Sequence, residues 1–298
     1  MFAPIIIFAF NRLEPLKKCV SALLSNKEAI RSDLIVFVDG SRARKEGEAE
    51  KVKTVQDYVK TIEGFKSLSY FFSEENKGLG PSIILGVTNV INKYGKVIVL
   101  EDDLVVAKGF LNYMNTMLDA YKGDNRIMQI TGFSTVHSVP KGYNYDIYLN
   151  RRGESWSWAT WEDRWNTVDW EVKDYHELLK DKRRQKAFND IGSDLFSMLK
   201  GYMNGLNRSW AVRFCYSMFK QGRYTVAPMK SLVLNDGFNE DATNCKSAFN
   251  LYRCEFNKEQ DSFHPVPNIP YVRSIDKSAN RFWSIRYRVY GKIISFFY

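Results

Sequence analysis

The first 135 residues alternate short apolar runs with longer segments of helical periodicity, and no other pattern in the sequence limits the fold so strongly. The apolar runs, rich in β-branched and aromatic residues, are predicted strands at residues 4–10, 34–38, 68–72, 97–100 and 127–130. Between them, apolar residues recur at helical spacing in three sets: Leu16, Val20, Leu23 and Leu24; Val52, Val55, Val59 and Ile62; and Phe110, Met114, Met117 and Leu118. This alternation predicts βαβ units, so we expect an α/β fold with a mostly parallel central sheet flanked by helices.

In folds of this kind, ligands bind at the carboxyl ends of the parallel strands. The polar residues that directly follow a predicted strand are therefore the first candidates for a binding site. They are Asn11 and Arg12 after the first strand, Asp39 and Gly40 after the second, and Glu101, Asp102 and Asp103 after the fourth.

The composition is that of a folded protein that buries a substantial core, since 45% of the 298 residues are hydrophobic. The apolar opening of the chain lacks a basic leader and runs into Asn11 and Arg12, so we expect a buried strand and neither a signal peptide nor a transmembrane helix. The four cysteines show no paired spacing and the histidines form no zinc set, which favours free thiols in a reducing compartment. They are Cys19, Cys215, Cys245 and Cys254.

The half after Tyr143 changes character and becomes rich in Trp, Tyr, Arg and Asn. It contains no internal repeat and no flexible linker, so we expect a single domain. The last part, residues 276–298, mixes basic and aromatic residues in a way that suits a helix at a membrane surface. A core helix or an oligomer contact is the alternative for this stretch.

The strongest chemical signal is VIVLEDDLVV, residues 97–106, where a predicted strand runs into three consecutive acidic residues. Three carboxylates at one strand end repel one another unless a cation joins them. A hard divalent ion, completed by a diphosphate and water, supplies that charge and stabilises a diphosphate leaving group. The alternative is that Glu101, Asp102 and Asp103 cap a helix near Ala107, where acidic side chains satisfy free amides.

Three weaker motifs lie at neighbouring strand ends. FAFNR places Arg12 where a guanidinium can meet a diphosphate, although an arginine there is commonly only solvated. VFVDGS places Asp39 where a carboxylate can accept hydrogen bonds from a nucleobase or ribose, with a turn aspartate as the alternative. ENKGLG contains glycines that permit close approach of a nucleotide or sugar, so Lys77 and Gly78 are further candidates.

In this order and spacing, PIIIFAFNR, VDGS, NKGLG and EDD resemble the nucleotide-sugar half of family 2-like GT-A glycosyltransferases. The segment VIVLEDDLVVAKGFLNYM is especially similar to the corresponding segment of the N-acetylglucosaminyltransferase I family. The resemblance implies a DxD-like motif in which Asp103 binds Mn²⁺ (or Mg²⁺), with Glu101 and Asp102 near the donor. It also implies donor-binding roles for Arg12 and Asp39.

The second half contains ESWSWATWEDRW, residues 154–165, which resembles the tryptophan-rich segment of bacterial polysaccharide glycosyltransferases in this group. Tryptophan faces stack on sugar rings, so Trp156, Trp158 and Trp161 are predicted to bind the acceptor. Core packing is the alternative for these three and for Trp165, and we expect at least two of the four to be buried.

The catalytic base does not follow from the resemblance. In the N-acetylglucosaminyltransferase I family an Asp soon after the tryptophan that corresponds to Trp210 is the base, whereas Ala211 and Val212 follow here. An inverting displacement still needs a group that takes the acceptor proton. The candidates are Asp163, Glu162 and Glu154. Asp163 is preferred because WED resembles the acidic base motif of family 2 enzymes, with a helix cap or an ion pair to Arg164 as the alternative.

A further acidic stretch, LNDGFNEDATN, contains Asp236 and Asp241. We expect it to form either a loop that closes over the donor or simple turns.

Together these features predict a metal-dependent, inverting glycosyltransferase with one GT-A catalytic domain. Residues 1–135 bind the nucleotide-sugar donor, residues 136–275 bind the acceptor, and residues 276–298 form a basic aromatic helix that contacts the membrane surface. The donor is a UDP-sugar by resemblance, and the acceptor is a hydroxyl of a cell-surface glycan or a lipid-linked oligosaccharide. We expect a cytoplasmic protein, peripheral at the inner face of the cell membrane.

Three other classes compete with this prediction. A sugar nucleotidyltransferase typically opens with a Gly-rich, basic phosphate loop, which FAFNRLEPLKK lacks. The net charge of +9 suits nucleic acid, anionic lipid and phosphorylated substrates alike, but a nucleic-acid-binding protein needs a basic groove and the strongest cluster here is acidic. A catalytically inactive glycan-binding domain is the third alternative, because the aspartate after Trp210 is missing.

Overall fold

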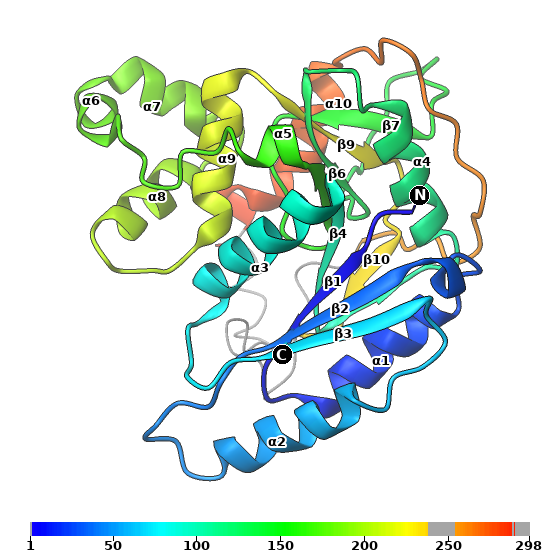
Figure 1. The fold of residues 1–298 in the computed structure, drawn as a ribbon. Helices are drawn as coiled ribbons and strands as arrows, with labels where there is room; N and C mark the ends of the chain where they lie inside the picture. The colour runs from blue at the N-terminus through cyan, green and yellow to red at the C-terminus, as the bar shows by residue number, and fades with distance from the viewer. Residues whose placement is uncertain (1, 238–253, 288, 290–298) are drawn as a thin grey trace.

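The computed structural model describes residues 2–237, 254–287 and 289, in which strands and helices alternate along the chain (Figure 1). In chain order the elements are β1 (Ile5–Ala9), α1 (Leu13–Leu24), η1 (Ala29–Arg31), β2 (Asp33–Val38), α2 (Glu48–Val59), β3 (Ser67–Phe72), α3 (Leu79–Tyr94), β4 (Lys96–Glu101), β5 (Leu104–Val106), α4 (Phe110–Ala120), β6 (Ile127–Thr131), β7 (Ile147–Asn150), β8 (Trp158–Trp161), α5 (Glu162–Trp165), α6 (Tyr175–Lys180), α7 (Lys182–Asn189), α8 (Leu195–Met203), α9 (Trp210–Gln221), β9 (Tyr224–Pro228), β10 (Val233–Asn235), α10 (Arg273–Asn280) and η2 (Arg281–Trp283). Each strand and each helix predicted for the first 135 residues is present.

Within the described residues, the main sheet has eight strands in the order β3-β2-β1-β4-β8-β6-β9-β7. The neighbours β3, β2, β1 and β4 run parallel, as the βαβ pattern predicts. In contrast, β8 lies antiparallel between β4 and β6, and β7 is antiparallel to β9. Because β8 comes from the second half of the chain but lies between two strands of the first, both halves share one sheet.

The inner strands of the sheet are buried on both faces, and successive residues along them point to opposite sides. In β1, Ile5 and Ile7 belong to the core formed with α1, α2 and α4, whereas Ile6 and Phe8 belong to the core formed with α3 and α9. Figure 1 shows α1 and α2 on one side of the strands β1 to β3 and α3 on the other. Gly86 lets α3 lie close to the sheet, since a Cβ there would be 2.9 Å from the Phe8 ring.

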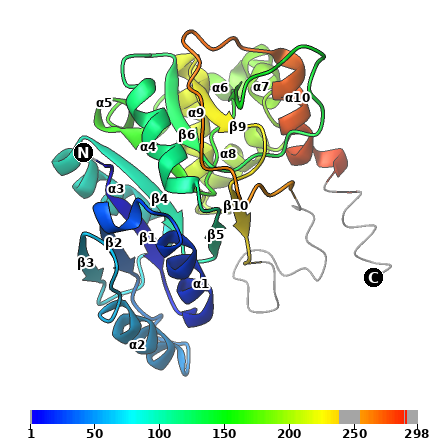
Figure 2. The same cartoon turned by 90° about the vertical axis from the view of Figure 1, so that its right-hand side faces the viewer.

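The helices α6 to α9 form a separate apolar cluster at the end of the molecule away from α1 and α2 (Figure 2). The amino end of α9 is capped by Ser209, whose side chain accepts a hydrogen bond from the Val212 amide. Among the helices of the described ranges, none is long and apolar enough to cross a bilayer.

In the described part of residues 276–298, α10 and η2 pack against the domain, whereas Ile285, Arg286 and Val289 are exposed, so the predicted contact with a membrane surface stays a prediction. Asp276 is fully buried and accepts hydrogen bonds from Arg151 Nε and the Tyr271 hydroxyl, each at 2.9 Å. Ala279 and Phe282 are each 1% exposed. Residue 288 and residues 290–298, which complete the predicted basic aromatic helix, lie outside the described residues, as do Cys245 and Asp241.

Candidate active site

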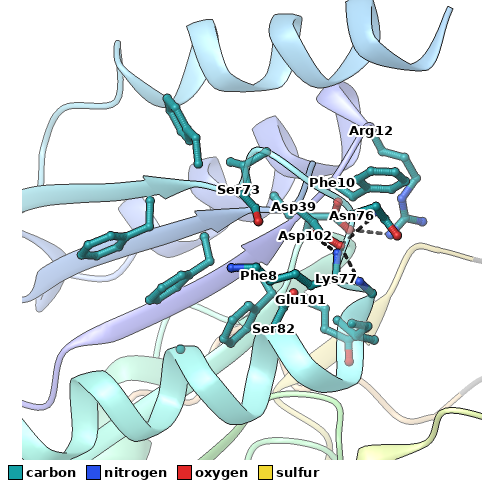
Figure 3. Close-up of a pocket in the computed structure, with 18 of the residues that line it drawn as sticks. Phe8, Phe10, Arg12, Asp39, Ser73, Asn76, Lys77, Ser82, Glu101 and Asp102 are labelled. Carbon is teal, nitrogen blue, oxygen red and sulfur yellow. Dashed lines mark hydrogen bonds and ion pairs between the residues drawn. The ribbon is translucent and has the colours of Figure 1, made fainter. Parts of the chain in front are cut away.

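A pocket of about 630 Å³ lies at the carboxyl ends of β1, β2 and β4 (Figure 3). Every residue predicted to bind the donor or a metal lines it, namely Arg12, Asp39, Lys77, Gly78, Glu101, Asp102 and Asp103. The register of the parallel strands explains this convergence: Phe8 pairs with Phe37 on one side and with Glu101 on the other, so the three strands end at the same level. The second half of the chain contributes Trp156, Asn235 and Gly237.

Arg12 joins two of the three carboxylates. Its Nη2 donates hydrogen bonds to Asp102 Oδ1 and, at 2.8 Å, to Asp103 Oδ2. Burial lowers the pKa of Arg12, but the charges of Asp102 and Asp103 raise this pKa by more than burial lowers it. The guanidinium therefore stays charged. One guanidinium therefore faces three acidic side chains.

The pKa values of Glu101 and Asp102 are both raised, chiefly by burial. Burial and the charges of Asp103 and Asp102 raise the pKa of Glu101 to about 8. Burial also raises the pKa of Asp102 to about 7, although Arg12 opposes the shift. The pocket therefore favours an additional cation beside the triplet.

Replacing Arg12 with Gln is expected to lower the free energy of unfolding by about 3–5 kcal/mol in EDTA, because it leaves Asp102 and Asp103 buried without their cation. Urea denaturation measures this change. The matched variant Arg126→Gln removes an exposed pair with Asp124 and should cost less than about 1 kcal/mol. A loss for Arg12→Gln no larger than that of the control would show that the ion pair does not stabilise the acidic cluster.

The surroundings of Asp103 fit a divalent cation. Its Oδ1 is buried and accepts no hydrogen bond in the described residues, and the backbone of Gly237 lies so close that a Cβ there would be 2.1 Å from Asp103 Oδ2. No group of three or more His, Cys, Asp or Glu side chains in the described ranges is arranged to hold a metal ion. Sites that take one or two carboxylates and complete the shell with substrate phosphates do not need such a group.

The alternative role of the triplet as a helix cap is not what the structure shows. The acidic residues are followed by the short strand β5, and α4 begins only at Phe110. The cap residue of α4 is Gly109, and the Leu111 amide in its first turn donates to Asn26 Oδ1 at 2.9 Å, so Asn26 and not the acidic triplet serves this end of the helix. The three carboxylates therefore face the pocket without satisfying the amides of α4.

Asp39 has a structural role in the loop beside it, and its predicted contact with a nucleobase or ribose stays a prediction. Its Oδ1 accepts from the amides of Gly40 and Lys77, at 3.0 and 2.9 Å, and its Oδ2 accepts from the Gly78 amide and the Asn76 side chain, at 2.8 and 3.1 Å. Both oxygens are thus engaged by the chain. Asp39 holds the loop of residues 76–78 against the end of β2, and this loop forms one wall of the pocket (Figure 3).

The glycines of this loop serve two purposes. Gly78 adopts φ +77° and ψ 159°, a conformation that other residues rarely take. Gly80 permits close packing of the chain on itself, because a Cβ there would lie 2.9 Å from the carbonyl oxygen of Arg208. The predicted close approach of a ligand therefore applies to Gly78, which lines the pocket, and Gly80 joins the two halves of the chain.

Replacing Gly78 with Ala is expected to lower the free energy of unfolding by about 1–3 kcal/mol, because the new side chain strains a backbone conformation restricted to glycine. Chemical denaturation measures the loss. Gly123→Ala is the control, since Gly123 has no atom within 4 Å of a Cβ and no positive φ; it should change stability by less than about 0.5 kcal/mol. A Gly78→Ala protein as stable as the control would contradict the strained loop.

Among the predicted acceptor residues, only Trp156 lines the pocket. Its ring packs edge-on against Phe133, with the centroids 4.7 Å apart, and the next residue, Ser157, adopts a positive φ of 53°. Trp158 and Trp161 are 1% and 2% exposed, so the structure corrects their prediction as acceptor-binding residues. With Trp165 also buried, the expectation that at least two of the four are core residues is confirmed.

Two of the three base candidates, the preferred Asp163 and its neighbour Glu162, lie near the amino end of β4, away from the carboxyl ends that form the pocket. Because β8 runs antiparallel to β4, its last residue, Trp161, pairs with Lys96 at the start of β4. The Glu162 amide donates to the Gly95 carbonyl at 2.9 Å, and the exposed Asp163 forms an ion pair with the buried Arg164. The structure therefore does not place Glu162 or Asp163 beside the pocket, and it favours the ion-pair alternative for Asp163.

Glu154, the third candidate, is buried two residues before Trp156, although it does not line the pocket. Burial raises the pKa of its carboxyl to about 7, with the charge of Arg152 opposing the shift. Asp236 forms an ion pair with Lys18 at 2.6 Å, while its neighbours Asn235 and Gly237 face the pocket beside Asp103.

Several pocket residues were not among the sequence candidates. Asn76 belongs to ENKGLG, and Asn235 and Gly237 belong to LNDGFNEDATN. Both motifs therefore indicated loops that contribute to the pocket, but other residues of these motifs were the candidates. The aromatic wall formed by Phe8, Phe37 and Phe71, with centroids 5.3 and 5.0 Å apart along the row, gave no separate signal because each residue reads as part of a strand.

A GT-A architecture combines such an α/β sheet with an acidic cluster at the end of the fourth strand, and the sequence comparisons agree. The family model "Glycosyl transferase family 2" matches residues 5–196, well over half of the chain. The chain therefore belongs to glycosyl transferase family 2 and is a glycosyltransferase, which confirms the predicted fold class and enzyme class. No functionally curated protein matches the sequence significantly.

Solved structures match the chain at low sequence identity and with TM-scores below 0.5. The S. aureus TarS structure is 13% identical, with a TM-score of 0.40, over 57% of this chain and 30% of that chain. The structure of TarS 1-349 from S. aureus is 14% identical, with a TM-score of 0.45, over 78% of this chain and 60% of that chain. The structure of UDP-glucose pyrophosphorylase complexed with UDP-glucose is 11% identical, with a TM-score of 0.40, over 77% of this chain and 91% of that chain. The chain thus spans less than two thirds of either TarS structure.

Proposed function

We propose that this enzyme transfers a sugar from a nucleotide-sugar, with UDP-sugars as the first donors to test, to a hydroxyl of a glycan or a lipid-linked oligosaccharide. The observation that supports this most strongly is the convergence of Arg12, Asp39, Lys77 and the acidic triplet on one pocket at the carboxyl ends of the parallel strands. The pocket volume of about 630 Å³ suits a ligand of nucleotide-sugar size.

We assign each pocket group a part in this reaction. Asp103 and the donor diphosphate would hold Mn²⁺ or Mg²⁺, and the ion would neutralise the charge that develops on the leaving diphosphate. Arg12 fixes the carboxylates of Asp102 and Asp103. Asp39 holds the loop of residues 76–78 in place, so the wall beside the donor is already formed before it binds.

In this proposal, residues of the second half of the chain bind the acceptor. Trp156 is half-buried on the pocket wall, where an indole face or edge can pack on a sugar ring. Contact with the inner face of a membrane is supported by Ile285 and Val289, which are 52% and 51% exposed next to the exposed Arg286. The acceptor of such an enzyme is a lipid-linked glycan at that surface.

Glu154 is the proposed catalytic base. It is the candidate nearest in the chain to Trp156, and a carboxyl with a pKa of about 7 is matched to proton transfer near neutral pH. Transfer with inversion requires the base on the face of the sugar opposite the leaving diphosphate, so the proposal requires the buried Glu154, which does not line the pocket in the structure, to reach the acceptor hydroxyl when both substrates are bound.

The proposed function is tested by incubating the protein with UDP-, GDP- and dTDP-sugars, with Mn²⁺ or EDTA, and following nucleotide release. Metal-dependent release from one class of donor is the expected result and identifies the nucleotide. If the folded protein binds nucleotides but releases none even with glycan acceptors, it is a binding domain. If it neither binds nor cleaves any donor, the proposal is wrong.

A further inference from the structure

The arginines inside the pocket are already engaged by carboxylates. Arg12 is bonded to Asp102 and Asp103, and Arg42 Nε donates to both oxygens of Glu48 at 3.0 and 3.1 Å. A diphosphate that enters the pocket also meets the acidic side chains of Glu101, Asp102 and Asp103, which line it. Binding of an anionic substrate therefore needs positive groups besides these two arginines and the proposed metal ion.

Arg208, from the second half of the chain, lies beside a residue that lines the pocket, although it does not line the pocket itself. Its Nη1 is 3.7 Å from the position that a Cβ would take on Gly78, a residue that lines the pocket. Its carbonyl oxygen is the atom that a Cβ on Gly80 would meet at 2.9 Å. The loop between α8 and α9 is thus packed directly on the loop that Asp39 holds.

This α8–α9 loop is fixed by its own hydrogen bonds. The Asn207 side chain donates to the Met198 carbonyl at 2.9 Å and accepts from the Ser209 amide at 3.0 Å. Ser209 in turn caps α9. Arg208 therefore extends from a backbone that is already ordered, which lowers the entropic cost of binding through it.

The charge of Arg208 is not used elsewhere in the part of the chain that the structure describes. It is exposed, and no hydrogen bond or ion pair to a described residue engages its guanidinium. The side-chain amine of Lys77, in the adjoining loop, has no such partner among these residues either. Two uncompensated cations thus flank Gly78.

We infer that Arg208 is a substrate-binding residue that contacts a phosphate group at the mouth of the pocket. The inference rests on the proposed function. An arginine suits this role because its planar guanidinium donates two parallel hydrogen bonds to phosphate oxygens. The phosphate belongs either to the donor diphosphate or to an anionic acceptor, and the two sources predict different results.

The test measures binding of UDP, GDP, dTDP and uridine by calorimetry in Mn²⁺ for the wild type, Arg208→Ala and Arg208→Lys. The control is Arg183→Ala, which removes an exposed arginine of α7. If Arg208 contacts the donor, Arg208→Ala weakens binding of the preferred nucleoside diphosphate about tenfold and leaves uridine binding unchanged. The Lys variant recovers part of the affinity, and the control matches the wild type.

A second arm identifies an acceptor phosphate. In that case Arg208→Ala binds nucleoside diphosphates like the wild type, but inhibition of nucleotide release by sn-glycerol 3-phosphate is about tenfold weaker. If neither diphosphate binding nor this inhibition changes, the inference is wrong while the proposed function stands. If the wild type binds no nucleoside diphosphate at all, the proposed function fails and the inference fails with it.

Discussion

Replacing Asp103 with Asn is expected to reduce nucleotide release about a thousandfold, which corresponds to about 4 kcal/mol of transition-state stabilisation. The substitution keeps the size of the side chain but removes the charge beside the proposed metal position, where Oδ1 is buried without a hydrogen bond in the described residues. It also weakens the hydrogen bond from Arg12 at 2.8 Å. Steady-state release from the preferred donor, measured over a range of Mn²⁺ concentrations, reports the loss.

Two controls separate this effect from a general loss of charge or of folding. Asp57→Asn removes an exposed carboxylate of α2 that pairs with Lys53 and Lys60, so it should leave turnover unchanged. Thermal denaturation of Asp103→Asn should show a folded protein. An Asp103→Asn enzyme that is folded and works within about threefold of the wild type would remove this residue from the metal site.

Replacing Glu154 with Gln is expected to lower kcat for transfer about a hundredfold, because the acceptor hydroxyl loses the group that takes its proton. Burial raises the pKa of Glu154 to about 7, and a base must be unprotonated to act. In the wild type kcat/KM should therefore rise with pH through about 7 and level off above it. The Gln variant should lack this limb, and its affinity for the donor should be unchanged.

The matched controls for Glu154 are the two rejected candidates. Glu162→Gln and Asp163→Asn change acidic residues near the amino end of β4, where β8 ends beside Lys96. Both variant enzymes should therefore transfer the sugar at the wild-type rate. If Asp163→Asn were the inactive variant and Glu154→Gln kept its pH limb, the placement of the acceptor side on the pocket would be wrong.

The donor half of the site could be predicted because its signals are local. Arg12, Asp39 and Asp103 each lie within three residues of the end of an apolar run, and parallel strands with helical crossovers end on the same side of the sheet. The convergence of these residues on one pocket therefore followed from the order of strands and helices alone. The role of Asp39 did not follow, because its hydrogen-bond donors come from residues 76–78, nearly forty positions along the chain.

The acceptor half could not be predicted in the same way. The strand WATW is buried on both faces, so it shows no alternation of polar and apolar residues, and its antiparallel position between β4 and β6 is set by tertiary pairing. Because β8 runs antiparallel to β4, Asp163 lies near the amino end of β4, whereas Trp156 lies near its carboxyl end, at the pocket. The burial of Trp158 and Trp161 follows from the same placement, since β8 is an inner strand covered by helices on each face.

The central claim is that the pocket at the ends of β1, β2 and β4 binds a nucleoside diphosphate together with a divalent cation held by Asp103. Calorimetric titration with UDP, GDP and dTDP, in Mn²⁺ and in EDTA, tests it most directly. The account predicts that the wild type binds one of them at least about tenfold more tightly in Mn²⁺ than in EDTA, and that Asp103→Asn loses this difference. Equal affinity in Mn²⁺ and EDTA for both proteins, or no binding of any nucleotide, would contradict it.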